Sequence, residues 1–217
     1  MARDADTTRR RILSVALALF REKGFAGTTM RKVAEEAGLS LGAAYHHFES
    51  KQAIVAAFYE QQHQAHEEAA RAGMAQASEL RERLSIVLHT ALDVRGLDRK
   101  LLRELAPLVV GPDDSLSAFS SSTAKLRAHS IQLYRDAVEV PSVPEDLREP
   151  LALALWALQM GLLLYFANDD SPRQRKTRAL LDGSLDLTMG IVIALSLPPM
   201  APLRGQLGKL LRDAGLL

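Results

Sequence analysis

Apolar side chains recur along this chain at intervals of three and four residues, which is the spacing of an amphipathic helix. Near the N-terminus, for example, Ile12, Ala16 and Phe20 fall on one helical face. No stretch alternates apolar and polar residues as a half-buried strand would, so the pattern predicts an all-α fold. The expected helices span roughly 7–23, 29–37, 41–48, 51–73, 78–94, 98–111, 114–138, 145–168, 171–195 and 203–214.

Two of these helices, 29–37 and 41–48, are short and lie on either side of a tight turn. Gly38 can adopt the left-handed conformation that ends a helix, and Ser40 can cap the helix that follows. A second helix displayed in this way can enter the major groove of DNA. Helix, turn and helix also occur in ordinary all-helical domains, so the turn alone does not decide between DNA binding and packing.

The turn and its flanks carry a longer ordered pattern of residues. Its members are Gly27, Thr28, Thr29, Val33, Ala34, Ala37, Gly38, Leu39, Ser40, Gly42, Tyr45, His47, Phe48 and Lys51. This pattern resembles the N-terminal domain of TetR-type transcriptional regulators, over about residues 7–58. The resemblance implies a three-helix helix-turn-helix module over residues 1–55. It also implies a helical ligand-binding and dimerisation domain over residues 56–217.

The resemblance also implies which side chains meet DNA. Contacts to the DNA backbone are expected from Thr28, Thr29, Tyr45, His47 and Lys51. Base reading is expected from Leu41, Gly42, Ala43 and His46, in a helix that Ser40 caps. Leu41 stands where many relatives carry lysine or arginine, and an apolar side chain there favours contact with a thymine methyl group. Packing within the module is the alternative role for Tyr45 and His47.

A module of three helices reads too few base pairs alone, so we expect a homodimer on palindromic half-sites about 34–36 Å apart. The helix expected over 145–168 is apolar nearly all round, and a helix of that kind must be covered on every side. In TetR-type proteins the last two helices of the body pair with their copies across a two-fold axis. The alternative is that these helices form the core of a monomeric bundle.

A ligand cavity in such a body would lie between helices, with mostly apolar walls and a few polar groups. The candidate lining residues are Phe119, Leu126, His129, Tyr134, Trp156, Gln159 and Met160. Ordinary core packing is the alternative for each of them. The central helices carry no charged cluster, which favours a small hydrophobic or aromatic effector. The chain is therefore predicted to be a transcriptional repressor that such an effector releases from its operator, or else a constitutive repressor without one.

Composition narrows the remaining classes of function. The 27 basic and 26 acidic side chains nearly balance, and the chain has no cysteine for a disulfide, a thiolate metal site or a nucleophile. No motif for a phosphate loop or a serine nucleophile is present, so we expect neither enzymatic activity nor a cofactor. The charged N-terminus lacks a signal peptide's apolar core, and the apolar run 151–167 is short for a membrane span. A cytoplasmic protein without a membrane partner is expected.

One further cluster, His63, His66 and Glu67, stands at i, i+3 and i+4 and therefore shares one helical face. That spacing can hold zinc or nickel, which makes a metal-binding helical protein a distant alternative. The neighbouring residues are strongly polar, so we expect this face to be solvated and to hold no metal.

Overall fold

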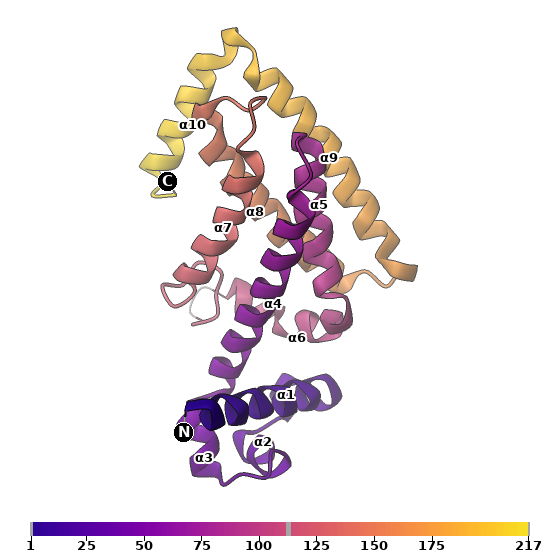
Figure 1. The fold of residues 1–217 in the computed structure, drawn as a ribbon, viewed down its shortest axis with the longest axis vertical. Helices are drawn as coiled ribbons and strands as arrows, with labels where there is room; N and C mark the ends of the chain where they lie inside the picture. Colours follow the sequence, from indigo (N-terminus) through magenta and orange to yellow (C-terminus); the bar gives the residue numbers. More distant parts are fainter. Residues whose placement is uncertain (1, 112–113, 217) are drawn as a thin grey trace. The chain divides into compact units, whose positions relative to one another are not determined.

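The computed structural model describes residues 2–111 and 114–216, and in these ranges helices are the only regular secondary structure (Figure 1). The α-helices are α1 (Ala2–Gly27), α2 (Met30–Glu36), α3 (Leu41–His47), α4 (Lys51–Met74), α5 (Leu80–Val94), α6 (Arg99–Val110), α7 (Ala124–Val138), α8 (Glu145–Asn168), α9 (Arg175–Ser196) and α10 (Ala201–Asp213). Three 3₁₀ turns connect them: η1 (Gly96–Asp98), η2 (Pro172–Gln174) and η3 (Pro198–Met200). The prediction of an all-α fold is confirmed.

Contacts along the chain separate it into two compact units. The first unit combines the segment that ends at His63 with Leu97–Lys125, and therefore contains α1, α2, α3 and α6. The second combines Gln64–Gly96 with the segment that begins at Leu126. The boundary at His63 and Gln64 falls inside α4, so one continuous helix contributes residues to both units.

The first unit is built around an apolar core from α1, α2, α3, the start of α4, and α6. Its fully or nearly fully buried side chains include Ile12, Phe20, Val33, Ala44, Phe48, Ile54, Phe58, Leu101 and Leu105. Burial of large aliphatic and aromatic side chains is the main favourable term in folding. Because α6 supplies Leu101 and Leu105 to this core, it belongs structurally with the N-terminal helices although α4 and α5 lie between α3 and α6 in the sequence.

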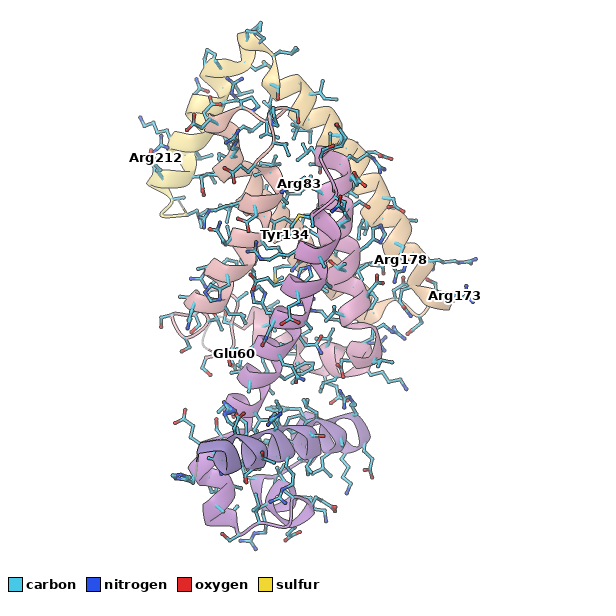
Figure 2. The ribbon with its side chains drawn as sticks, viewed as in Figure 1. Glu60, Arg83, Tyr134, Arg173, Arg178 and Arg212 are labelled. Atoms are coloured by element: carbon cyan, nitrogen blue, oxygen red, sulfur yellow. The ribbon has the colours of Figure 1, made fainter. Side chains whose placement is uncertain are left out.

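The second unit packs α5, α7, α8, α9 and α10 around buried side chains such as Leu84, Leu88, Tyr134, Phe166 and Leu185. Arg83 fastens three backbone carbonyls, since its guanidinium donates to Ala77, Asp136 and Ala137 (Figure 2). Two ion pairs join α5 to α9, Arg81 with Asp186 and Arg178 with Asp93, and a hydrogen bond joins His89 to Asp182. The chain then turns at η3, and α10 returns against α8 (Figure 1).

The helix expected over 114–138 begins only at Ala124, and this prediction is wrong for its first ten residues. Short polar side chains in this segment bond the local backbone instead. Asp114 Oδ1 accepts from the Leu116 N–H, and the Thr123 hydroxyl donates to the Ser117 carbonyl oxygen. Ser, Thr and Asp side chains that bond neighbouring backbone groups compete with helix formation, which explains the late start.

The helix expected from Ser171 also begins later, at Arg175. Arg173 and Gln174 lie in the left-handed region, with φ of 54° and 50°, and this interrupts the run from η2 into α9. Asp169 stabilises the bend. Its carboxylate accepts from the Ser171 N–H and from both the N–H and the hydroxyl of Thr177. The junction is therefore a fastened turn between two long helices.

Candidate functional site

The turn between α2 and α3 is held entirely by local backbone geometry. Gly38 has a φ of +64°, which a glycine adopts without the steric cost of a Cβ. The Gly38 N–H donates to Glu35 O at 3.0 Å and the Leu39 N–H donates to Ala34 O at 2.9 Å. These two bonds form a Schellman motif, in which the following apolar residue, here Leu39, packs back against the core.

The N-termini of α2 and α3 are each capped by a side-chain hydroxyl. Thr29 Oγ1 accepts from the Lys32 N–H at 3.2 Å, and Ser40 Oγ accepts from the Ala43 N–H at 3.2 Å. Thr28 is buried and its hydroxyl donates to Gly24 O. Of the two threonines at the start of α2, Thr29 is therefore the one whose side chain lies at the surface. Ser40 has the capping position that the sequence predicts for it.

The helix α3 is amphipathic, with one face buried in the core of the first unit and the other exposed. Ala44 and the following Phe48 are buried in the core, whereas Gly42, Tyr45 and His46 are exposed. Tyr45 is 48% exposed, so its ring does not act mainly as a core residue. The remaining candidates, Leu41, Ala43 and His47, are partly buried. The helix thus offers small, aromatic and imidazole side chains to a partner on its outer face.

Two imidazoles sit in the last turn of α3. The rings of His46 and His47 contact each other edge to face, with centroids 5.5 Å apart. Each imidazole has a ring N–H that can donate a hydrogen bond.

Lys51, the first residue of α4, is partly enclosed by Phe25. Its ammonium donates to the Phe25 carbonyl oxygen at 2.7 Å and lies 4.4 Å from the centroid of the Phe25 ring. Burial lowers the pKa of Lys51 from its ordinary value. The same surface carries Arg9 of α1, whose guanidinium lies 4.2 Å from the centroid of the Phe48 ring. Both cations therefore make cation–π contacts that restrict their side chains.

Phe25 is a residue that the sequence pattern indicates only as part of the apolar core of this module, and it also organises this corner. Besides Lys51, it engages Glu104 of α6, whose carboxylate accepts from the Phe25 N–H at 3.0 Å. The two residues are 79 positions apart in the sequence. A contact of this kind has no local sequence signal.

The side chains expected to line an effector cavity are only partly brought together. In the second unit, the Tyr134 hydroxyl donates to Gln159 Oε1 at 2.6 Å, with both residues buried and Trp156 buried nearby in sequence. Burial raises the pKa of Tyr134 well above its usual range, against a smaller opposing effect of the Arg95 charge. The Tyr134 hydroxyl therefore remains protonated and acts as a donor.

The other predicted lining residues are less enclosed. Leu126 and Met160 are partly buried, and His129 is exposed. Phe119 is 73% exposed and belongs to the first unit, so its placement gives no support to a role in lining this core. Around Tyr134 and Gln159 the structure is packed, and a small ligand there would have to displace side chains.

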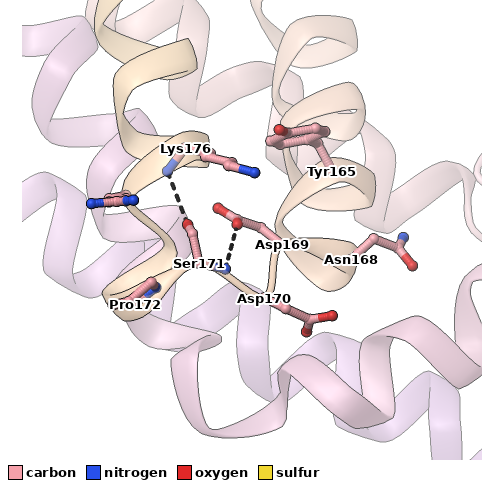
Figure 3. Close-up of a pocket in the computed structure, with 8 residues that line it drawn as sticks. Tyr165, Asn168, Asp169, Asp170, Ser171, Pro172 and Lys176 are labelled. Carbon is pink, nitrogen blue, oxygen red and sulfur yellow. Dashed lines mark hydrogen bonds between the residues drawn. The ribbon is translucent and has the colours of Figure 1, made fainter.

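A shallow pocket of about 490 Å³ lies elsewhere, at the junction of α8 and α9 (Figure 3). Its lining is polar and consists of Tyr165, Asn168, Asp169, Asp170, Ser171, Pro172, Arg175 and Lys176. Burial opposes the ionisation of Asp169, but the hydrogen bonds from Ser171 and Thr177 outweigh it and hold the pKa of that carboxyl well below its usual range. The Asp169 carboxylate is therefore already hydrogen-bonded within the protein. The pocket also differs from the predicted effector cavity in both its lining residues and its polarity.

The outward faces of α8 and α9 carry apolar side chains that the second unit does not cover. They are Leu164, Tyr165, Leu180, Leu187, Ile191 and Ile193. Gly161, Gly183 and Gly190 are also open to approach, since a Cβ at any of them would meet nothing within 4 Å. By length and composition alone both helical segments could cross a membrane, with half of the apolar window buried in Glu145–Asn168 and 17% in Pro172–Ser196. Exposed apolar side chains that gather on one surface can mark an interaction site.

The histidine cluster is not the solvated face that its sequence setting suggested. His63 and His66 are both buried, and His66 Nε2 lies 2.8 Å from the Val87 carbonyl oxygen, which fixes that nitrogen as a donor. Glu67 pairs with Arg71. Within the described residues, no group of three or more His, Cys, Asp or Glu side chains is arranged to hold a metal ion. The prediction of a solvated face was wrong, because both imidazoles are buried and the His66 ring lies against the Val87 carbonyl of α5.

Two family profiles match separate parts of the chain. Residues 12–58 match the profile described as "Bacterial regulatory proteins, tetR family". Residues 83–203 match the profile described as "Tetracyclin repressor-like, C-terminal domain", which alone covers more than half of the chain. The chain belongs to the TetR family. It is accordingly a DNA-binding transcriptional regulator with a helix-turn-helix module, in a family that is generally non-enzymatic.

Among TetR-family relatives, the chain is 28% identical to "Probable HTH-type transcriptional regulator ArpR" of Pseudomonas putida. That match covers 87% of this chain and 75% of ArpR. Other similarities are confined to the N-terminal part, such as 49% identity over 45 residues with YerO of Bacillus subtilis, which spans 21% of this chain and 16% of YerO. The chain thus resembles these regulators most strongly in the helix-turn-helix.

Solved TetR-family structures share the fold. A regulator from Nitrosomonas europaea superimposes with a TM-score of 0.66 at 16% identity, over 83% of this chain and 97% of that one. The fatty acid degradation regulator FadR of Bacillus halodurans gives 0.61 at 17% identity, over 84% of this chain and 95% of that one. At these identities the similarity concerns the fold alone.

Proposed function

We propose that this TetR-family protein is a repressor that binds a palindromic operator as a homodimer and is released by a small hydrophobic or aromatic effector. The observation that carries the proposal is α3 itself. The helix is capped by Ser40 and presents Gly42, Tyr45 and His46 on its exposed side. A recognition helix must combine a fixed backbone with an outward face free to enter the major groove.

Specificity and affinity are assigned to different side chains in this proposal. Leu41, Gly42, Ala43 and His46 would meet base edges, with Leu41 against a thymine methyl group. Thr29, Tyr45, His47 and Lys51 would meet the DNA backbone. Thr28 would act only indirectly, because it is buried and both its hydroxyl and its backbone N–H donate within the protein. Phosphate contacts supply most of the affinity and make it sensitive to salt.

The exposed apolar faces of α8 and α9 support a homodimer. A second copy of these two helices would cover Leu164, Leu187 and Ile191, and the glycines would let the helix backbones approach closely. Burial in a dimer also accounts for the apolar character of α9 without a membrane. A cytoplasmic location follows for a protein whose partner is DNA.

The effector would occupy the core of the second unit around Tyr134, Trp156 and Gln159. These side chains supply an apolar surround with one polar pair, which is the usual make-up of a small-molecule site. Since the core is packed, the effector would bind a minor, more open conformation and shift the population toward it. A constitutive repressor that needs no effector is the second candidate.

The experiment that tests the proposal is selection of bound duplexes from a random-sequence DNA pool at fixed salt, followed by sequencing. A palindrome with two half-sites, each carrying a thymine at the position met by Leu41, is the expected result. Failure of the folded protein to enrich any sequence would overturn the proposal. A screen of hydrophobic compounds for thermal stabilisation then separates the effector-controlled protein from the constitutive one, because a ligand that binds only the folded state raises its stability.

A further inference from the structure

Both backbone groups of Phe25 are held by side chains, and the two side chains come from different helices of the first unit. On one side, Glu104 Oε2 of α6 accepts from the Phe25 N–H at 3.0 Å. On the other, Lys51 Nζ at the start of α4 donates to the Phe25 carbonyl oxygen at 2.7 Å. Phe25 is therefore a link between a carboxylate on α6 and the ammonium assigned to a DNA phosphate.

Gly24 makes room for the Glu104 carboxylate. Its φ of +77° ends the regular part of α1 and directs the Phe25 N–H away from that helix. A Cβ at residue 24 would lie 3.0 Å from Glu104 Oε2, so a larger residue would crowd the carboxylate as well as strain the backbone. Both the positive φ of Gly24 and its lack of a Cβ therefore allow the Glu104 carboxylate to reach the Phe25 N–H.

The Phe25 ring is also fixed. It packs edge to face on Phe20, with centroids 5.3 Å apart and planes at 64°, and Phe20 is fully buried in the core. The Lys51 ammonium sits 4.4 Å from the centroid of the same ring. An ammonium has three donors, and the Phe25 carbonyl takes one, so Lys51 can be held in place and still donate to a phosphate oxygen.

We propose that Glu104 is a positioning residue for DNA binding, which holds Phe25 so that Phe25 in turn fixes the Lys51 ammonium for contact with a phosphate. The inference rests on the proposed function, because the contact between Lys51 and phosphate is part of it. It adds a residue of α6, outside the helix-turn-helix, to the set that determines affinity for DNA.

Electrostatics and positioning predict opposite effects when the Glu104 carboxylate is removed. A negative charge near DNA repels phosphates, so its loss alone would tighten binding. Loss of a positioning contact would weaken binding, because the Lys51 ammonium would have to be ordered at the moment of association. The sign of the change therefore distinguishes the two roles.

The experiment measures affinity of the full chain for the selected operator duplex at several salt concentrations. The variants are Glu104→Ala, Glu104→Gln, Glu104→Asp and Lys51→Ala, with the double variant of Glu104→Ala and Lys51→Ala. Glu60→Ala is the matched control, since Glu60 is an exposed acid of the same unit, on α4 (Figure 2). Thermal unfolding of each variant is recorded alongside.

We expect Glu104→Ala to bind about three- to tenfold more weakly, the range of one modest hydrogen bond, and to lose part of the salt dependence that Lys51→Ala loses. Glu104→Gln keeps an acceptor but loses the charge, so it should bind at least as tightly as the wild type. Glu104→Asp keeps the charge but is too short to reach Phe25, so it should also weaken binding. It therefore tests the inference if Glu104→Ala does not fold. On the Lys51→Ala background, Glu104→Ala should have no further effect.

Two results would overturn the inference while leaving the proposed function intact. One is that the wild-type protein binds the operator and that Glu104→Ala and Glu104→Asp have the same operator affinity as Glu60→Ala. The other is a loss of affinity that is equally large with and without Lys51, which would indicate a general structural role. If the wild-type protein binds no duplex at all, the proposed function fails and this inference fails with it.

Discussion

The Tyr134 hydroxyl and the Gln159 side-chain oxygen are joined by a 2.6 Å hydrogen bond between α7 and α8, with both residues buried. A buried acceptor costs free energy if its donor is removed, whereas removal of both partners can be nearly neutral. The pair therefore ties two helices of the second unit together by a contact that tolerates loss of both members better than loss of one.

We expect Tyr134→Phe to lower the free energy of unfolding by about 1–3 kcal/mol, because Gln159 Oε1 loses its donor in a dry site. The double variant of Tyr134→Phe and Gln159→Leu should recover much of that loss. Urea unfolding of the three proteins measures both effects. Equal midpoints for Tyr134→Phe and the wild type would contradict the prediction.

Asp169 should make the protein sensitive to acid. Burial opposes its ionisation, but bonds from Ser171 and Thr177 outweigh that cost and depress its pKa in the folded state. A depressed pKa contributes stability above the ordinary aspartate value of about 4, and this contribution is lost as the pH falls toward the folded value. Asp169→Asn should thus be less stable than the wild type at pH 7, with the gap narrowing by about pH 3. Thermal melts at both pH values measure the gap, and a gap independent of pH would argue against this role.

The apolar face of α9 should be needed for self-association. Leu187 and Ile191 are 72% and 58% exposed and lie one helical turn apart. Leu187→Asp together with Ile191→Asp should yield monomers by analytical ultracentrifugation and reduce affinity for the palindromic operator. Leu97→Asp is the control, because Leu97 is 97% exposed but lies in the first unit. A dimer that survives the α9 substitutions would rule out this face.

Ser40 and Ser50 offer a matched pair of helix caps. Their hydroxyls accept from Ala43 N–H at 3.2 Å and from Ala53 N–H at 3.1 Å. Replacement of either by alanine should cost about 1 kcal/mol of stability. Ser40→Ala should also weaken operator binding by several-fold, since it frays the start of α3. Ser50→Ala should weaken it less, through Lys51 at the start of the helix that Ser50 caps. Denaturation and DNA titration of both variants measure these effects, and an unchanged DNA affinity of Ser40→Ala would show that α3 does not depend on its cap.

Local signals explain why much of the fold could be predicted from the sequence. Gly38 and Ser40 determine the turn by their own conformation and hydrogen bonding, so the helix-turn-helix was recognisable without tertiary information. The range 145–168 was equally clear, since Pro144 precedes the helix and the apolar run continues to its end. The exposed positions of Tyr45 and His46 also agree with the surface expected for α3.

The features that sequence could not supply depend on distant partners. The bond between Glu104 and Phe25 spans 79 residues, and the burial of His66 depends on the Val87 carbonyl of α5. The helix predicted over 114–123 was wrong for a local reason. The Ser, Thr and Asp side chains of this segment can form hydrogen bonds with the backbone in turns, which compete with those of a helix. For the effector site, several candidates such as His129 and Phe119 proved to be at the surface.

The helix α4 runs without interruption from Lys51 to Met74, and both compact units draw on it. This continuity constrains the construction of hybrid regulators. A chimera that keeps the chain through His63 and continues into the body of another repressor would place its seam within α4. Each residue added or removed at the seam would turn every later side chain by about 100° around the helix axis. Functional hybrids should therefore recur only at seam lengths that preserve helical phase.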